Sequence, residues 1–102
     1  MNENMLHIYS FLAQAKAFLI KGTIFSNFVL TGQEEIKEEM SDGENPIVLS
    51  IYDTEHFGDE KTDYYFDSQD LENAIINNNY LIMPDEDGSP VCINILVPLV
   101  LK

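Results

Sequence analysis

Hydrophobic residues in the first part of the chain recur with the spacing of a helix. Between residues 4 and 21 they follow one another at steps of about three or four, which predicts an amphipathic helix lying against a sheet. The residues of this stripe are Met5, Ile8, Phe11, Leu12, Ala15, Phe18 and Leu19. Lys21 followed by Gly22 predicts the end of the helix.

The next apolar segment, Thr23–Leu30, is rich in β-branched and aromatic residues and predicts a short strand. Its centre, Ser26-Asn27, is polar, and a helix is predicted on either side of it in the sequence. Such a strand is expected at the edge of a sheet, where its backbone groups are available to a partner.

A second helix is predicted over Gly32–Met40, with Thr31 and Glu34 forming a capping box at its start. Ile36 and Met40 lie four residues apart on one face. Glutamates fill the rest of the surface: Glu34, Glu35, Glu38 and Glu39. The last two oppose the helix dipole, so local stability does not account for them. They favour a surface selected for charge, although an ordinary solvated helix face is the alternative.

Ile47–Tyr52 is almost continuously apolar, which predicts a central strand. An acidic connection over residues 53–60 joins it to a second strand, Lys61–Phe66, as a hairpin. Of the aromatic residues Tyr64, Tyr65 and Phe66, at least one must lie on the outer face of a simple sheet.

The remaining pattern predicts a short helix after Ser68, including Leu71, Ala74 and Ile75, and then strands at Tyr80–Met83 and Val91–Leu96. A tight turn at 85–90 would join these strands, and Val97–Leu101 would continue at an edge because Pro98 cannot donate to a ladder. The expected fold is a single α+β domain over 1–102. An antiparallel sheet of about five strands would be packed by the N-terminal helix and the acidic second helix, with Ile47–Tyr52 and Val91–Leu96 as the core strands.

Charge changes the picture more than any motif does. The chain has 18 Asp and Glu against five Lys, no Arg and a net charge of −13. Residues 1–33 hold one acid and two lysines, whereas residues 34–102 hold 17 acids and three lysines.

Self-repulsion between this many negative charges destabilises a compact state, so we expect the electric field of the acids to attract a partner. Direct binding of nucleic acid is disfavoured because clustered Lys and Arg are lacking, and a basic protein surface is the expected partner. Solubility, or a halophilic source, is the alternative.

The sequence contains no motif for chemistry. Asp53, Glu55 and Asp63 are paired carboxylates in principle, but acids run along the whole hairpin instead of gathering in a cleft. His56 is expected to be an exposed loop histidine. Asp85–Gly88 resembles part of a calcium loop, yet Leu96 stands where a bidentate glutamate would be needed. We therefore expect no enzyme activity, no metal and no cofactor.

Two further features bear on location. Cys92 is the only cysteine, which excludes an internal disulfide, and it is expected to be a small buried hydrophobe in a reducing cytoplasm. The N-terminus has no basic region before its apolar segment and no small-residue cleavage site, which argues against secretion and against a membrane span. The expected location is the cytoplasm, that of the host cell if the protein is phage-encoded.

The segment from Thr31 to Phe66, with the helix EEIKEE, the strand IVLSIYD, an acidic turn and a second strand, resembles the phage uracil-DNA glycosylase inhibitor family. The order of elements is also similar, and the likeness covers about two-thirds of the chain. It implies a DNA mimic whose carboxylates take the places of phosphates in the enzyme's groove. The resemblance implies an edge strand that inserts into the groove and an apolar pocket that captures the enzyme's base-flipping leucine.

By position, the resemblance places partner contacts on the edge strand Ile24–Leu30 and the second helix, with Ile36 and Met40 lining the pocket. The family's edge strand carries a glutamate followed by Ser-Ile, whereas this chain has Ser26, Asn27 and Phe28. Residues 68–79 and the chain after Leu96 are further departures. The predicted partner-binding residues are Ser26, Asn27, Phe28, Glu34, Glu35, Glu38, Glu39, Asp53, Glu55, Asp59 and Glu60.

The predicted function is inhibition of a host DNA-binding enzyme, with uracil-DNA glycosylase as the first target. One alternative is an anti-CRISPR, anti-restriction or immunity protein that binds another basic nuclease or DNA-binding protein. A second alternative is an acidic interaction module without an inhibitory role.

Overall fold

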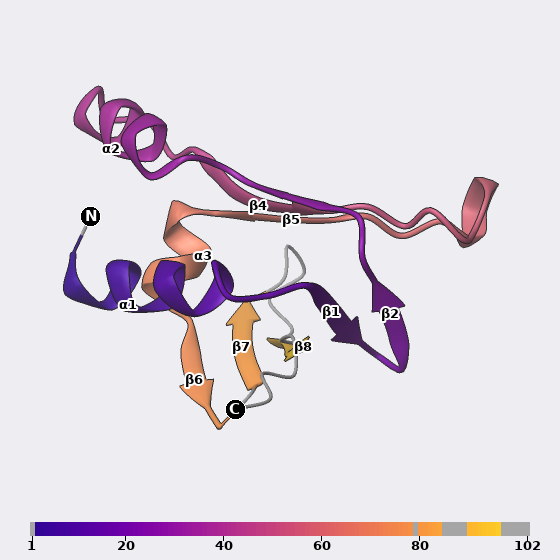
Figure 1. The fold of residues 1–102 in the computed structure, drawn as a ribbon. Helices are drawn as coiled ribbons and strands as arrows, with labels where there is room; N and C mark the ends of the chain where they lie inside the picture. The colour runs from indigo at the N-terminus through magenta and orange to yellow at the C-terminus, as the bar shows by residue number, and fades with distance from the viewer. Residues whose placement is uncertain (1, 79, 85–89, 97–102) are drawn as a thin grey trace.

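The computed structural model describes residues 2–78, 80–84 and 90–96. These residues form an α+β domain of three α-helices and eight strands in two antiparallel sheets (Figure 1). The helices are α1 (Glu3–Leu12), α2 (Gln33–Ser41) and α3 (Ser68–Glu72), and one 3-10 turn, η1, covers Gly58–Glu60. The strands are β1 (Ala17–Ile20), β2 (Thr23–Phe25), β3 (Phe28–Leu30), β4 (Ile47–Ile51), β5 (Tyr64–Asp67), β6 (Ile75–Asn77), β7 (Tyr80–Pro84) and β8 (Pro90–Leu96). The predicted fold class is confirmed.

The first helix is shorter than its hydrophobic stripe predicts. The Asn2 side chain caps it by accepting from the Met5 amide, and the helix ends at Leu12. Residues 17–20 instead form β1, which pairs with β8 on one side and β2 on the other. Lys21 and Gly22 both have positive φ, 50° and 82°, and make the tight turn of a hairpin whose strands twist together. The prediction of one helix over residues 4–21 is wrong after Leu12, because sheet pairing overrides the helical spacing.

The predicted strand Thr23–Leu30 is split into two. β2 pairs with β1 in one sheet, and β3 pairs with β4 in the other. Ser26 and Asn27, the polar pair at the centre, are exposed between them. The prediction of one strand is therefore wrong, whereas its edge position is confirmed, because β2 and β3 each lie at the edge of their sheet.

The two sheets have the orders β2-β1-β8-β7-β6 and β3-β4-β5. The central position predicted for Ile47–Tyr52 is confirmed by β4, and its hairpin partner is β5. The prediction of a single sheet that contains both core strands is wrong, since β4 and β8 belong to different sheets. Their buried side chains nonetheless join one hydrophobic core.

The predicted third helix also ends early. Asp67, one residue before the predicted Ser68, caps α3 through a capping box with Asp70. Ile75, predicted as helical, begins β6, which turns through Asn78, at a φ of 58°, into β7. Residues 85–89 and 97–102, which hold most of the predicted turn and the predicted edge segment, lie outside the described residues.

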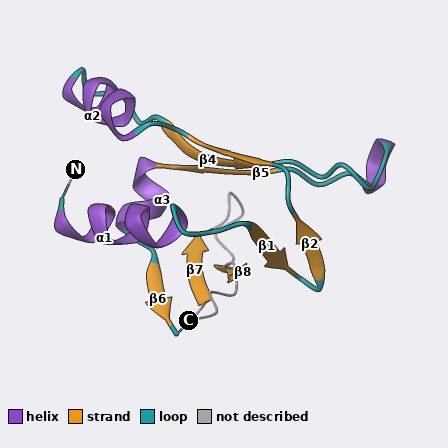
Figure 2. Ribbon diagram, in the orientation of Figure 1, coloured by secondary structure: helices purple, strands orange, loops and turns teal. Residues whose placement is uncertain are grey.

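The inner face of the five-stranded sheet is covered by α1, α3 and the three-stranded sheet (Figure 2). Phe18 of β1 meets Phe28 of β3 edge-on, with ring centroids 4.7 Å apart, and so links the two sheets. Cys92 is exposed, so its predicted burial is wrong: along β8, Val91, Ile93 and Ile95 point into the core and Cys92 points outward. Among the described residues, no helix is long and apolar enough to cross a membrane.

Candidate partner-binding surface

The acidic residues gather at the two ends of the ribbon that β4 and β5 form. Twelve of the 18 acids lie within residues 31–67, which contain two lysines. Figure 1 shows α2 at one end of this ribbon and the connection that contains η1 at the other. We call these ends the α2 cluster (Glu34, Glu35, Glu38 and Glu39) and the loop cluster (Glu55, Asp59 and Glu60). The ribbon therefore carries negative charge at both ends and little between them.

The α2 cluster is presented to solvent by a helix with a single buried residue. Ile36 is fully buried, and Met40 packs against the core while remaining partly exposed. Glu34, Glu35 and Glu38 are exposed and Glu39 is partly exposed. Within the described residues these four carboxylates form no ion pair. Their charge is thus left available to a partner.

The start of α2 is fixed by backbone and hydroxyl contacts and not by the predicted capping box. Gly32 is the N-cap residue, and the Thr31 hydroxyl donates instead to the Ile47 carbonyl at 2.8 Å. The Thr31 amide donates to the Val48 carbonyl, and the Tyr9 hydroxyl donates to the Thr31 carbonyl at 2.8 Å. The capping-box prediction is wrong because β4 takes the threonine hydroxyl. These contacts set the direction in which α2 leaves the sheet.

The end of α2 is anchored to α3. The amides of Gly43, at a φ of 82°, and Glu44 donate back to carbonyls of the last helical turn, which is the usual glycine-terminated helix end. Asn45 then bonds three groups at the start of α3: its amide donates to Asp67, and its carbonyl accepts from the Ser68 hydroxyl and the Gln69 amide. The α2 cluster is therefore held at both ends of its helix.

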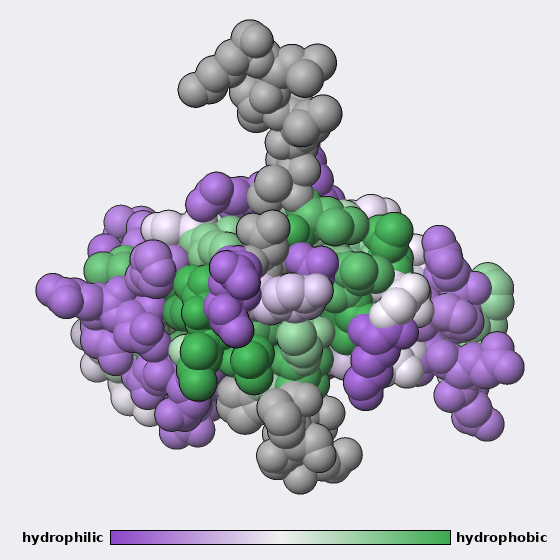
Figure 3. Space-filling view, turned by 90° about the horizontal axis from the view of Figure 1, so that it is seen from below, coloured by the Kyte–Doolittle hydropathy of each residue, from purple (hydrophilic) through white to green (hydrophobic). Residues whose placement is uncertain are grey.

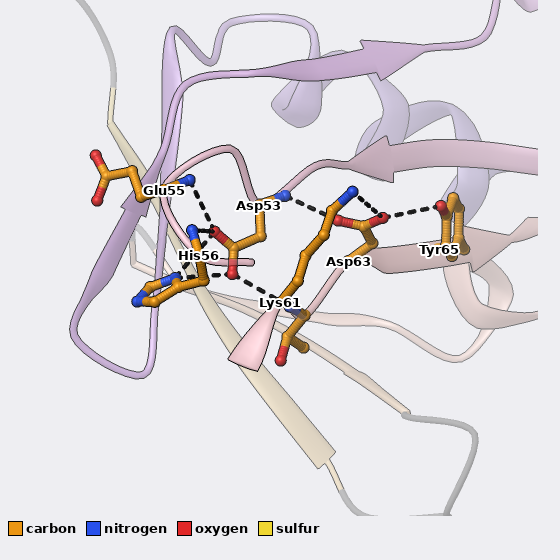
Figure 4. A network of polar contacts seen from close by, with 7 residues as sticks. Asp53, Glu55, His56, Lys61, Asp63 and Tyr65 are labelled. Atoms are coloured by element: carbon orange, nitrogen blue, oxygen red, sulfur yellow. Dashed lines mark hydrogen bonds and ion pairs between the residues drawn. The ribbon is translucent and has the colours of Figure 1, made fainter. Parts of the chain in front are cut away.

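The loop cluster is organised by one buried carboxylate, Asp53, which is 4% exposed (Figure 4). One of its oxygens accepts from the amides of Glu55 and His56 at 3.1 and 3.2 Å, and the other accepts from the Thr62 amide at 3.1 Å. The His56 ring nitrogen Nδ1 lies 2.9 Å from the second oxygen. Asp53 therefore ties both sides of the loop together.

A second carboxylate extends this network. The Asp53 amide donates to Asp63 at 2.9 Å, and the Tyr65 hydroxyl donates to the other Asp63 oxygen at 3.3 Å. Lys61 lies 3.8 Å from the same oxygen. Burial of the Tyr65 phenol and the charge of Asp63 raise the pKa of Tyr65, so this hydroxyl remains a donor at neutral pH.

The contacts shift the pKa values of the Asp53–His56 pair in opposite directions. Desolvation alone would raise the pKa of Asp53, but the Thr62 amide, the His56 ring and two other loop amides outweigh it and lower the pKa from 3.8 to about 2. The hydrogen bond and charge of Asp53 raise the pKa of His56, with partial burial opposing and Glu60 and Glu55 adding to the rise. His56, predicted as an exposed loop histidine, is only partly exposed and is a partner of Asp53.

The outer face of the three-stranded sheet lies between the two clusters. Exposed Tyr65 confirms the prediction that at least one of Tyr64, Tyr65 and Phe66 faces outward, whereas the other residues of this face were not identified from the sequence. Val29 of β3, Ser50 of β4 and Tyr65 of β5 face one another across the strands. Val29 is 54% exposed and Tyr65 45% exposed, and the Tyr52 ring packs edge-on against Tyr65. We call Val29, Ser50, Tyr52 and Tyr65 the ribbon face. Strict alternation along β3 and β5 is the signal that would have found it.

The predicted site residues fall into three groups. The α2 cluster and the loop cluster are accessible, as are Ser26 and Asn27 between β2 and β3. Asp53 is buried and can affect a partner only by shaping the loop. Phe28 is half-buried against Phe18, and Ile36 is fully buried, so a partner could reach Ile36 only if α2 moved. Phe57, 82% exposed beside η1, is an apolar loop residue that the prediction did not include.

Comparison with known proteins adds no family to this geometry. No protein-family model matches the chain, and no curated protein matches it. In the part of the chain that the structure describes, no group of three or more His, Cys, Asp or Glu side chains is arranged to hold a metal ion. The two acidic clusters and the ribbon face are therefore the features of the described residues that indicate a function.

Proposed function

We propose that this protein is an acidic inhibitor that occupies the DNA-binding groove of a host enzyme, with uracil-DNA glycosylase as the first target to test. One observation carries the proposal: carboxylates that form no ion pair among the described residues stand at both ends of the ribbon, and the exposed side chains of Val29 and Tyr65 lie between them. A cytoplasmic location and a phage origin belong to the same proposal.

The ribbon that separates the two clusters is long enough to span several phosphates of DNA. The six residue steps from Ile47 to Asp53 cover about 20 Å at about 3.3 Å per residue. DNA places one phosphate on each strand at about 3.4 Å of helix axis, so this length corresponds to about six base-pair steps. Carboxylates at the two ends would meet lysines and arginines that otherwise hold phosphates several steps apart.

The ribbon face would supply the apolar contact between these charges. In the resemblance to glycosylase inhibitors, that contact is a pocket lined by Ile36 and Met40. The burial of Ile36 favours Val29 and Tyr65 instead, since these side chains are accessible without any movement of α2. Aromatic residues in the centre of an interface often dominate binding energy, whereas charges at its rim govern encounter rate and salt dependence.

The first test is uracil excision from duplex DNA by a purified glycosylase at an equimolar amount of this protein. We expect inhibition that weakens as salt is added, because salt screens the carboxylates. Absence of both inhibition and a complex on gel filtration would remove this target. Displacement of labelled DNA from other basic DNA-binding enzymes, including restriction, CRISPR and toxin nucleases, would then test the broader mimic.

Matched variants separate a mimic from a protein whose acids serve only solubility. Glu34→Gln with Glu35→Gln removes two charges from the α2 cluster, and Glu3→Gln with Glu72→Gln removes two exposed charges from α1 and α3. We expect the first pair to weaken binding to the target roughly threefold to tenfold and the second to change it little. If neither pair changes binding, the acids serve only solubility, as in the interaction module without an inhibitory role; equal weakening by both pairs would show that net charge alone governs binding.

A further inference from the structure

The outer face of the five-stranded sheet has the opposite character from the ribbon. None of the residues in β2, β1, β8, β7 and β6 is charged, although 23% of the whole chain is. An antiparallel sheet with one face in water normally alternates apolar residues with polar or charged ones. β8, with the sequence PVCINIL, is instead apolar on both faces apart from Asn94. This pattern is typical of a strand that is covered on both sides.

The pairing register places the outward residues in continuous rows. One row crosses all five strands through Ile24, Leu19, Asn94, Tyr80 and Asn77, and a second joins Cys92, Ile82 and Ile75. We call Leu19, Ile24, Ile75, Tyr80, Ile82 and Cys92 the neutral face.

Side chains of the neutral face are accessible. Ile75 is 62% exposed, Ile24 57% and Tyr80 46%, and Cys92 is also exposed. Figure 3, seen from below, where these strands lie in Figure 1, shows apolar residues across the middle of the molecule and hydrophilic residues at both ends. Contiguous exposed apolar patches of this kind mark interaction sites.

Charge decides what kind of partner fits. A basic protein finds no carboxylate on these strands to pair with, and a partner that brought charged side chains to this face would bury them without counter-charges. A second copy presents the same uncharged apolar face and can pack sheet against sheet about a two-fold axis. We infer that the neutral face is the contact between two copies of this chain.

The same arrangement keeps the acidic regions apart. Packed sheets are about 10 Å from one another. The three-stranded sheets of the two copies would therefore lie about 30 Å apart, on opposite outer sides of the dimer. This distance is several times the Debye length, which is about 8 Å at physiological salt. Repulsion between the acids would be largely screened, and both ribbon faces would remain free for targets. Salt should therefore strengthen the dimer while it weakens target binding.

Sedimentation of the whole protein over a range of concentrations tests the inference. We expect a species with twice the 11.6 kDa mass of one chain, populated more fully in higher salt. Ile24→Lys and Ile75→Lys each put a charge into the neutral face without touching the core, and both should give the monomer. Val29→Lys is the matched control, since Val29 is a β-strand residue with similar exposure on the opposite sheet, and it should remain dimeric.

The Cys92 thiol gives an independent reading of the same contact, because it lies on the central strand of this sheet. Its modification by a thiol reagent should slow as protein concentration rises, and it should stay fast at every concentration in Ile75→Lys. A wild-type chain that sediments as a monomer at all concentrations would overturn the inference. The inference would also be overturned if Val29→Lys abolished the dimer while both Ile24→Lys and Ile75→Lys left it intact.

Discussion

The two sheets of this protein divide its polar and apolar surface between them. The five-stranded sheet has no charged residue in any strand, whereas the segment from α2 to β5 carries twelve of the 18 acids. Both regions contribute side chains to one core through contacts such as that between Phe18 and Phe28. The difference shows that the acidity is concentrated in one region, because an even spread would also have placed charge on the outer face of the larger sheet.

The largest expected effect tests whether the two regions fold as one unit. Phe18 is fully buried and joins the sheets, so Phe18→Ala should lower the free energy of unfolding by about 3–5 kcal/mol. Denaturant unfolding followed by near- and far-ultraviolet circular dichroism should still show one transition. Val29→Ala, at an exposed position, is the control and should change stability little. Two separated transitions would mean that the acidic region unfolds independently.

A smaller and local effect is expected in the loop cluster. Asp53→Asn replaces one carboxylate oxygen by an amide group that cannot accept from the Thr62 amide or from a protonated His56. The amides of Glu55, His56 and Thr62 should then exchange with solvent about tenfold faster, while amides in β8 stay protected. Unchanged exchange in the loop would show that Asp53 does not hold it.

The same pair makes the loop sensitive to pH in two directions. The lowered pKa of Asp53 gives a stabilising contribution that is present above its ordinary 3.8 and is lost as the pH falls through about 2. The raised pKa of His56 gives a second stabilising contribution. It is present below the ordinary pKa of 6.5 and is lost as the pH rises through the pKa of His56 in the folded protein. Loop protection should therefore be greatest between about pH 4 and pH 6.5. Histidine titration by NMR should show a pKa for His56 above 6.5, and Asp53→Asn should remove most of that rise, since only the charges of Glu60 and Glu55 would still favour the protonated ring.

The smallest expected effect concerns α2 itself. Glu39→Gln removes a negative charge near the C-terminal end of the helix dipole and should raise the free energy of unfolding by about 0.3–1 kcal/mol at low salt. Glu34→Gln removes a negative charge from the first turn of the helix and should leave the free energy of unfolding unchanged or lower it. Each change relieves one like-charge pair four residues away, but Glu34→Gln also removes the attraction between Glu34 and Lys37 three residues on, so the difference between the two measures the dipole contribution together with that attraction. A gain from both would show that repulsion within the α2 cluster dominates.

The sequence predicted the elements that depend on local pattern. The helix with Ile36, the buried strand β4, its hairpin with β5 and the edge positions of β2 and β3 all follow from periodicity and turn residues. The errors arose where one pattern fits two structures. Phe11, Ala15, Phe18 and Leu19 continue a helical stripe, but Phe18 and Ile20 also alternate as a strand, and pairing with β8 decided between them.

The surface was predicted in part. The exposure of the glutamates in α2 could be predicted, because Ile36 and Met40 mark the one apolar face of that helix. The roles of Asp53 and Asn45 could not be predicted from the sequence, because each depends on amides that folding brings together. Cys92 was assigned to the wrong face, because β8 is apolar on both sides and periodicity gives no direction in such a strand.

The attachment of α2 has a consequence for how this protein can evolve. Ile36 is the only residue of that helix that is fully buried, and the hydrogen bonds that orient the helix come from Thr31 and from the turn and Asn45 that follow it. Apart from Met40, which packs against the core, its other positions can accumulate substitutions with little effect on folding. A lineage under pressure to recognise a changing target could therefore rewrite the charge pattern of α2 while it inherits the same scaffold.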